Sequence, residues 1–244
     1  MDIAKNLVDF HSHVLPGIDD GSPDLDTSIQ MLKMAYAQGI ETVVATPHFD
    51  ANYDTPESFL SRRNEAEALL RKEMEKHDDM PRLHVGAEVF YFSGISDSVH
   101  LMDLTIEKTP FILVEMPTCD WTDHMYAELE GINLKQGLIP IVAHLDRYIR
   151  PIGFGRMVRQ LRKLPVLIQC NTEFFQRPST QRKAWKMLRK GSIHLLGSDC
   201  HDTRHRPPDL GNTAEQICKS IGDQWLNHIS LYQDDILNGL RRIL

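Results

Sequence analysis

Two short segments of the chain carry pairs of residues that could bind one metal ion. His11 and His13 are separated by one residue, and Asp199 and His201 repeat this spacing near the other end of the chain. Residues i and i+2 of an extended segment point the same way, so both members of a pair can face one ion. Nitrogen and oxygen donors without a thiolate cluster are typical of a catalytic Mn²⁺, Fe or Zn²⁺ site. The pattern therefore predicts a metal centre.

Further candidate ligands follow other short apolar runs or lie in the loop after the first one. They are Asp20, His48, Glu88, Glu115 and His144, and Asn171 has a similar position. In parallel α/β folds the carboxyl ends of the strands converge, so these side chains are expected to meet there. Histidines without this placement are interpreted as surface or packing residues: His77, His84, His100, His124, His194 and His228. The role of His205, beside Arg206, stays open.

The apolar runs that must position these residues alternate with longer amphipathic stretches. The predicted strands are Leu7–Phe10, Thr42–Ala45, Leu83–Val85, Phe111–Val114, Ile139–Ala143, Val166–Gln169 and His194–Leu196. Strands that alternate with helices indicate parallel βα units. Seven such units favour an α/β barrel over an open doubly wound sheet, and no linker divides residues 1–244 into separate domains.

Two helix starts are marked by a capping residue followed by proline. Ser22-Pro23-Asp24 predicts that Ser22 caps a helix with Pro23 at its first position, and Gly39 is expected to end that helix. Thr55-Pro56-Glu57 predicts a second helix start in the same way.

Composition limits the classes of function. The chain has 244 residues, 41% hydrophobic and 25% charged, and a formal net charge of −7, which is typical of a globular protein and argues against a nucleic-acid-binding role. Four scattered cysteines predict reduced thiols and no disulfide framework. With no signal-peptide pattern and no apolar run of about 18 residues, we expect a cytoplasmic protein without membrane insertion.

The ordered set of motifs resembles the PHP (polymerase and histidinol phosphatase) metallophosphoesterases. The matching segments are Asp9-Phe10-His11-Ser12-His13, Thr46-Pro47-His48, Gly86-Ala87-Glu88, Glu115, Ala143-His144-Leu145-Asp146-Arg147 and Ser198-Asp199-Cys200-His201. More narrowly, the chain is similar to the bacterial protein-tyrosine phosphatases encoded in capsule and exopolysaccharide loci. These share the His-Ser-His start, the Asp-Asp-Gly loop and an Arg-Pro-Pro sequence, here Arg206-Pro207-Pro208.

This resemblance, which extends from Asp9 to about Gly211, implies a single-domain, TIM-like, distorted (β/α)7 barrel with three divalent ions. Mn²⁺ is the expected ion, with Fe or Zn²⁺ as alternatives. By analogy, the ligands of the three ions are His11, His13, Glu88 and Asp199 for the first; Glu88, Glu115 and His144 for the second; and Asp20, His48 and His201 for the third. Arg147 and Arg206 are the expected phosphate-binding residues. Asp146 departs from the usual Glu, which puts in doubt how Arg147 is held.

The implied activity is hydrolysis of phosphotyrosine by a hydroxide that bridges the ions. The expected substrate is the tyrosine-rich tail of a membrane-associated autokinase that regulates capsular or exopolysaccharide synthesis. Histidinol phosphate or another small phosphomonoester is the alternative substrate, and a non-catalytic PHP assembly module is the second alternative. Family members can self-assemble, so a homo-oligomer is also open.

One competing motif runs from Cys200 to Arg206, with the C-x₅-R spacing of cysteine-dependent tyrosine phosphatases. This segment lacks the glycine that would let backbone N–H groups surround a phosphate. Cys200 also lies between Asp199 and His201, so its thiol is expected to point away from them. A cysteine mechanism is therefore rejected.

Overall fold

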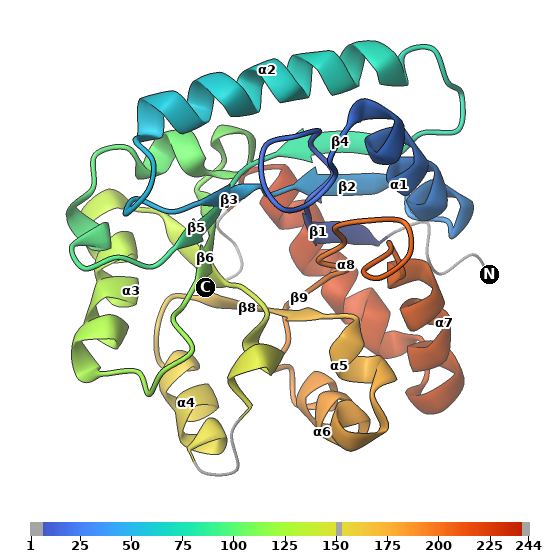
Figure 1. Cartoon of the computed structure of the whole chain (residues 1–244). Coiled ribbons are helices and arrows are strands. Elements are labelled where there is room, and N and C mark those ends of the chain that lie inside the picture. The colour runs from blue at the N-terminus through green and yellow to red at the C-terminus, as the bar shows by residue number, and fades with distance from the viewer. Residues whose placement is uncertain (1–6, 150–152, 241–244) are drawn as a thin grey trace.

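The computed structural model describes residues 7–149 and 153–240 as parallel strands alternating with helices (Figure 1). The strands are β1 Val8–Ser12, β2 Thr42–Ala45, β3 His48–Phe49, β4 Arg82–Val85, β5 Glu88–Phe90, β6 Phe111–Glu115, β7 Ile139–Val142, β8 Leu167–Asn171 and β9 Leu195–Gly197. The α-helices are α1 Leu25–Ala37, α2 Pro56–Met74, α3 Asp123–Gln136, α4 Phe154–Leu161, α5 Glu173–Gln176, α6 Pro178–Arg189, α7 Leu210–Ile221 and α8 Gln224–Leu237. No helix in these described ranges is both long and apolar enough to cross a membrane.

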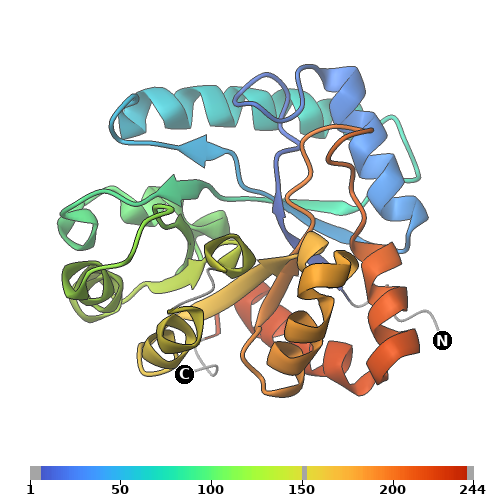
Figure 2. The same cartoon turned by 60° about the horizontal axis from the view of Figure 1, so that its bottom comes forward.

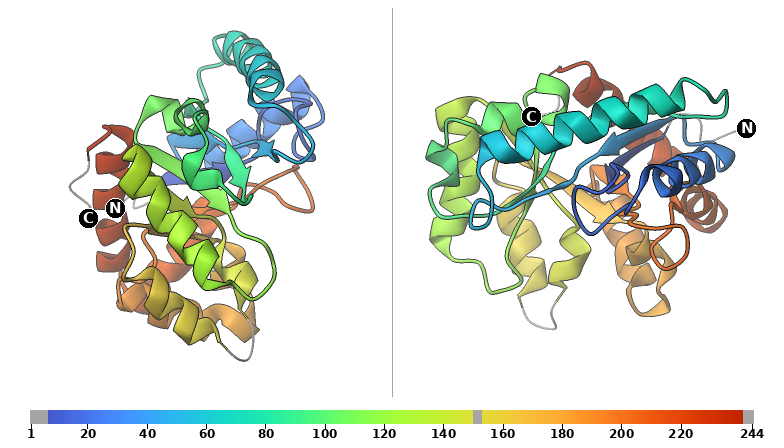
Figure 3. Two further views of the ribbon diagram at one scale, coloured as in Figure 1. Left: turned by 90° about the vertical axis from the view of Figure 1, so that its left-hand side faces the viewer. Right: turned by 45° about the horizontal axis from the view of Figure 1, so that its top comes forward.

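All the strand pairs are parallel and fall into two sheets. One sheet has the order β1-β2-β4 and the other the order β3-β5-β6-β7-β8-β9. Helices surround the strands in the views of Figures 2 and 3, because both faces of a parallel sheet must be covered. The chain therefore has an α/β fold in which a parallel sheet curls into a half-barrel.

The first and last strands also lie side by side. The Asp199 amide donates to the His11 carbonyl at 2.7 Å, and the His13 amide donates to the Cys200 carbonyl at 2.9 Å. These bonds extend the pairing of β1 to the segment that follows β9. Residues that are 188 positions apart in the sequence are thereby held next to each other at the carboxyl end of both strands.

The predicted strands agree with the observed ones to within two residues at each end, and Thr42–Ala45 is confirmed without change. Two short strands, β3 and β5, were not predicted. They continue β2 and β4 after the interruptions at Thr46-Pro47 and Gly86-Ala87, and they pair with each other. Pro47 has no N–H to donate to a ladder, which explains one interruption.

The two helix starts differ in outcome. Thr55 caps α2 as predicted, because its side chain accepts from the Ser58 amide and Pro56 is the first helical residue. The prediction for Ser22 and Pro23 was wrong, since α1 begins two residues later than expected. Its cap is Asp24, whose side chain accepts from the Thr27 amide, while the Ser22 hydroxyl donates to the Asp24 carbonyl.

Apolar and polar side chains share the inner face of the strands in successive positions. In β6, Leu113 belongs to a buried apolar cluster, and Glu115 is two residues further along the strand. In β8, Leu167 belongs to the same cluster and is followed at the same spacing by Gln169 and Asn171. Alternate residues of a strand share a face, so the apolar cluster supports a polar layer at the carboxyl end.

Candidate metal centre

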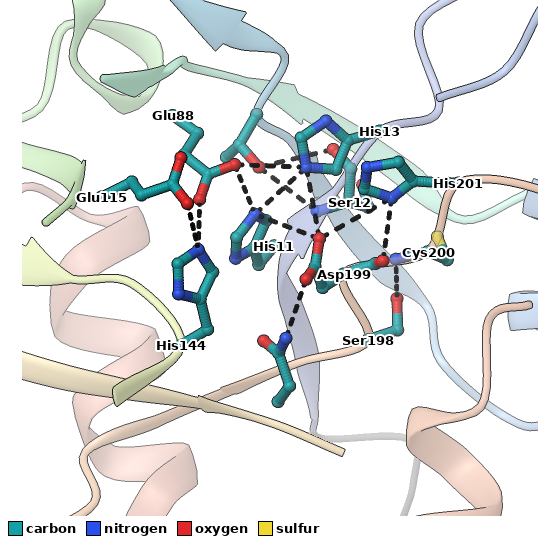
Figure 4. A network of polar contacts seen from close by, with 12 residues as sticks. His11, Ser12, His13, Glu88, Glu115, His144, Ser198, Asp199, Cys200 and His201 are labelled. Carbon is teal, nitrogen blue, oxygen red and sulfur yellow. Dashed lines mark hydrogen bonds and ion pairs between the residues drawn. The ribbon is translucent and has the colours of Figure 1, made fainter. Parts of the chain in front are cut away.

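The polar layer is centred on Glu88, the first residue of β5, which is buried (Figure 4). Its Oε2 atom lies 3.0 Å from His11 Nε2, 3.3 Å from His13 Nε2 and 3.1 Å from His48 Nδ1. Its Oε1 atom lies 2.8 Å from His144 Nε2. Four imidazoles from three strand ends therefore face one carboxylate, since His11 and His13 both belong to the end of β1.

A second group lies on the side of His13 and His48. The Asp20 Oδ1 atom is 3.4 Å from His48 Nε2 and 3.5 Å from His201 Nε2. Donor atoms of His13, Asp20, His48 and His201 all lie within 4.8 Å of one another, as do those of His11, His13 and Glu88. Both groups have the size and donor types of a divalent metal site.

The third group joins Glu88 to Glu115 and His48, again with donor atoms within 4.8 Å. His144 completes this side, since its Nε2 atom lies 3.3 Å from Glu115 Oε1. His144 has a φ of 30° and Asp199 a φ of 53°, and both values lie in the left-handed region that non-glycine residues rarely adopt. Such backbone strain concentrates at functional sites because the surrounding structure must enforce it.

Asp199 connects the histidine cluster to two arginines. Its Oδ1 atom lies 3.6 Å from His11 Nε2 and 3.4 Å from His13 Nε2. On the other side, Oδ2 accepts from Arg206 Nη2 at 2.7 Å and also contacts the Arg147 guanidinium. The side chains of Arg147 and Arg206 are 37% and 40% exposed, so both can reach an anion that approaches from solvent.

The electrostatics of the cluster are dominated by the close packing of carboxylates and imidazoles. Burial acts to raise the pKa of Glu88, but His11, His13 and His144 hold it well below its usual range. Burial acts to lower the pKa of His144, yet Glu115 and Glu88 raise it to about 9. The carboxylates thus stay ionised, and a bound cation would replace the proton that they draw onto His144.

Unsatisfied polar atoms test whether this site fits metal ions. Glu88 Oε2 has three imidazole nitrogens within 3.3 Å but forms no hydrogen bond, and His201 Nε2 is likewise buried without a hydrogen-bond partner in the described residues. Buried polar atoms are normally satisfied, and leaving one unpaired costs about 1–3 kcal/mol. Both atoms point into the groups of donors described above (Figure 4), so a bound cation would give each of them a partner. The donors present therefore fit a divalent cation.

All the metal ligands expected from the sequence meet in this one region: His11, His13, Asp20, His48, Glu88, Glu115, His144, Asp199 and His201. Asp20 is the most exposed of them, with 69% of its side chain accessible. The histidines interpreted as surface or packing residues do not belong to the metal-binding groups found in the described ranges. His205 is exposed and lines a cavity with Arg206.

Sequence reasoning missed Asp19 and Gln169, which hold candidate ligands in place, and it named Asn171 only as a strand-end residue without this contact. Asp19 accepts from the His48 amide at 3.0 Å, and its Oδ2 atom lies 2.8 Å from His13 Nδ1. Gln169 Oε1 accepts from the His144 amide, and Asn171 Nδ2 donates to Asp199 Oδ2 at 2.8 Å. Such partners fix the tautomer and orientation of metal ligands. Gln169 and Asn171 are alternate residues of β8, and this alternation was the sequence signal that could have placed both side chains on one face of the strand.

Asp146, the departure noted in the sequence, has a defined partner. Its Oδ1 atom accepts from the Asn171 amide at 2.8 Å. The shorter side chain therefore acts on the strand end that positions Asp199, since Asn171 also donates to that carboxylate.

The structure also bears on the cysteine motif. Cys200 is 1% exposed, and burial raises the pKa of its thiol well above the usual value. A nucleophilic cysteine needs a lowered pKa and access to substrate. In Figure 4 the sulfur of Cys200 points away from the cluster of imidazoles and carboxylates, as expected from the sequence.

Two cavities flank the cluster. One, of about 440 Å³, is lined by Arg147, Arg206 and Asp199 together with residues such as Gln176 and Arg177. The other, of about 320 Å³, is lined by the aromatic residues Trp121, Tyr126, Tyr148 and Phe154 and by Arg156. The Tyr148 ring lies 5.9 Å from the His144 ring, so this aromatic cavity is close to the cluster as well.

Comparison with known proteins agrees with this architecture. Tyrosine-protein phosphatase CpsB of Streptococcus agalactiae is 25% identical over 234 residues, covering 91% of this chain and 94% of its own length. Tyrosine-protein phosphatase YwqE of Bacillus subtilis is 31% identical over 219 residues, covering 82% and 79%. The fold matches a solved structure described as one of the metal-dependent tyrosine phosphatases YwqE from Bacillus subtilis and CpsB from Streptococcus pneumoniae. The TM-score is 0.84 at 23% identity, covering 96% of this chain and 95% of the other.

The strongest assignment comes from a family model. The family described as "Capsular polysaccharide synthesis, CpsB/CapC" matches residues 7–237, which include the whole candidate metal centre. The chain belongs to the CpsB/CapC family of capsular polysaccharide synthesis.

Proposed function

We propose that this protein is a metal-dependent protein-tyrosine phosphatase whose metal centre is the cluster around Glu88. The observation that carries the proposal is the convergence of imidazoles on Glu88 Oε2, with two arginines bound to the neighbouring Asp199. The tyrosine phosphatase names of the relatives, and the metal dependence in the description of the solved structure, support it.

The ligands proposed for the ions are the nine residues named from the sequence, with three divalent ions and Mn²⁺ as the expected metal. When bound, these ions would lower the pKa of water and neutralise phosphoryl oxygens. The chain itself would supply Arg147 and Arg206, whose guanidinium groups can bind phosphate oxygens in a bidentate manner. Phosphate binding would draw both arginines from Asp199 towards the substrate. Tyrosinate is a fairly good leaving group because the pKa of a phenol is about 10.

We also propose that the curled sheet closes into a single-domain (β/α)7 barrel. The backbone hydrogen bonds between β1 and the segment after β9 support closure on one side. On the other side, the β4–β5 segment pairs with both β2 and β6, and so links the two sheets.

The substrate is proposed to be phosphotyrosine on the tyrosine-rich tail of a membrane-associated autokinase that regulates capsular or exopolysaccharide synthesis, in keeping with the family's description. The purified chain with Mn²⁺ should release phosphate faster from a tyrosine-phosphorylated peptide than from histidinol phosphate at equal concentration. A chelator should abolish the activity, and added Mn²⁺ should restore it. Faster turnover of histidinol phosphate would overturn the substrate assignment and keep the metal mechanism, whereas activity that resists the chelator would overturn the metal mechanism.

A further inference from the structure

A strongly basic surface covers the outer side of α4 and α6. The whole chain has 27 Lys and Arg residues against 34 Asp and Glu residues, yet between residues 153 and 192 the only acidic residue is Glu173. On α6 and just after it, the exposed cations are Arg182, Lys183, Lys186, Arg189 and Lys190. These positions follow the spacing i, i+1, i+4, i+7 and i+8, which places them on one face of a helix.

The neighbouring helix adds to this surface. Arg159 on α4, and Arg162 and Lys163 just after it, are exposed as well. The two helices are neighbours because they follow the paired strands β7 and β8, and the Lys183 ammonium lies 4.9 Å from the centre of the Phe154 ring at the start of α4. Both helices lie in the lower half of Figure 1. We call these cations of α4 and α6 the basic face.

The basic face lacks internal compensation. Within the described ranges, none of its members forms an ion pair with a carboxylate, whereas the nearby Arg177 pairs with Glu173. Like charges held this close repel one another and lower stability unless a counter-charge is available. A dense, uncompensated basic patch on an otherwise acidic protein thus indicates an anionic partner.

The shape of the face distinguishes between kinds of anionic partner. Its members line neither of the two cavities beside the metal centre, so the face lies apart from the surface on which a phosphorylated substrate would bind. None of the exposed large hydrophobic side chains among the described residues lies between residues 153 and 192, so there is no exposed aromatic ring for stacking nucleic-acid bases. What remains is an array of cations about 12 Å long from Arg182 to Lys190, given the rise of about 1.5 Å per residue along a helix.

We propose that the basic face binds the surface of an anionic lipid bilayer by electrostatic attraction, without insertion of side chains into the hydrocarbon core. Clusters of Lys and Arg on a helix face are suited to this because each contributes independently to attraction towards anionic headgroups. The amino ends of α4 and α6 lie at the carboxyl ends of the strands, where Arg156 and Arg177 line the two cavities of the site. Docking on the basic face therefore places the mouth of the metal centre at the edge of the bilayer surface, open to the side.

The proposal is tested by flotation of the purified protein with two kinds of vesicle. One is pure phosphatidylcholine, and the other contains about one third phosphatidylglycerol. The variant carries Arg182→Gln, Lys186→Gln and Arg189→Gln. Its control, Lys72→Gln, Lys76→Gln and Arg82→Gln, removes the same charge from exposed positions on α2 and its C-terminal side. Neither set touches the metal centre, so activity on a soluble phosphopeptide should be unchanged in both.

We expect wild type and the control to bind the anionic vesicles, and the variant to bind them about 100-fold more weakly, because each neutralised cation contributes about fivefold to binding near such a surface. Binding should also weaken steeply as salt is raised. Equal binding to neutral vesicles, or equal loss in variant and control, would refute the proposal. Retention of wild type on duplex DNA or on a soluble acidic polypeptide, but not on anionic vesicles, would overturn the lipid assignment. Vesicle binding requires no turnover, so these results stand apart from the outcome of the phosphatase assay.

Discussion

Replacement of Asp19 by Asn tests whether the metal centre depends on a carboxylate behind its ligands. The Asp19 side chain is 5% exposed, and its Oδ2 atom lies 2.8 Å from His13 Nδ1. Its two oxygens also accept from the His48 and Gly21 amides. Burial acts to raise the pKa of Asp19, but the His13 ring and these amides lower it to about 2, so the group is an anion at neutral pH.

An Asn side chain keeps one acceptor oxygen and turns its NH₂ group towards at least one of these donors. The charge-assisted bond to His13 is worth about 2 kcal/mol, and its loss corresponds to about 30-fold weaker Mn²⁺ binding, within the range of about 10–100-fold typical of residues that support metal ligands. Calorimetric titration of the metal-free protein with Mn²⁺ measures this directly. Activity should return at saturating Mn²⁺, because Asp19 is a positioning residue that does not contact substrate.

The matched control is Asp26→Asn, which removes the same charge from an exposed position on α1. It should bind Mn²⁺ like wild type. If Asp19→Asn binds Mn²⁺ within about twofold of wild type, the orienting role of Asp19 is refuted. If activity stays absent at saturating Mn²⁺ while the variant remains folded, Asp19 does more than orient His13.

Three further outcomes follow from the structure. Arg206→Lys should lower kcat/KM on a phosphotyrosine peptide by about 100-fold, because lysine cannot make the proposed bidentate contact with phosphate. The control, Arg204→Lys, changes an exposed position of the same loop and should leave kcat/KM unchanged. Equal kinetics for the two variants would contradict the proposed phosphate-binding role of Arg206. Cys200→Ser should retain activity within a few-fold, since the thiol is buried, and a loss of several orders of magnitude with metals still bound would restore the cysteine mechanism. Burial, with the nearby His228 and Arg162, lowers the pKa of His194 to about 4, so the unfolded chain takes up a proton between about pH 6.5 and 4 that the folded chain does not. The free energy of unfolding should therefore fall by about 2 kcal/mol between pH 7 and 5 because of His194. Urea unfolding of His194→Gln should show a smaller fall over this interval. An equal fall in the variant and wild type would contradict a lowered pKa of His194.

The convergence of the candidate ligands in one place could be predicted because strand periodicity and chain order carry most of that information. His11, Glu115 and His144 each follow or end a short apolar run, and parallel strands bring such ends together whatever the details of the helices between them. Seven of the nine strands of the described residues were predictable to within two residues, since their apolar runs are short and bounded by polar segments.

The supporting contacts could not be predicted for a physical reason. Asp19 and Asp20 are adjacent in one loop, yet the Asp19 side chain is buried and that of Asp20 is exposed. The loop conformation that separates them is closed by a hydrogen bond from the Ser22 amide to the His13 carbonyl. Likewise, β3, which continues β2 from His48 onward, forms by pairing with β5, about forty residues further along the chain. Local patterns do not encode such choices, because they are made by contacts between distant segments.

The proximity of the first and last strands has a consequence for protein synthesis. Because synthesis runs from the N-terminus, His11 and His13 leave the ribosome long before Asp199, His201 and Arg206. One edge of β1 has no β9 segment to pair with until then, and the α8 residue Gln233, which bonds both the amide and the carbonyl of Val8, arrives later still. The nascent chain consequently carries an incomplete set of candidate metal donors until the segment after β9 has been made. A chain that ends before Gln233 should bind metal more weakly than one that includes α8, even though all nine candidate ligands are present in both.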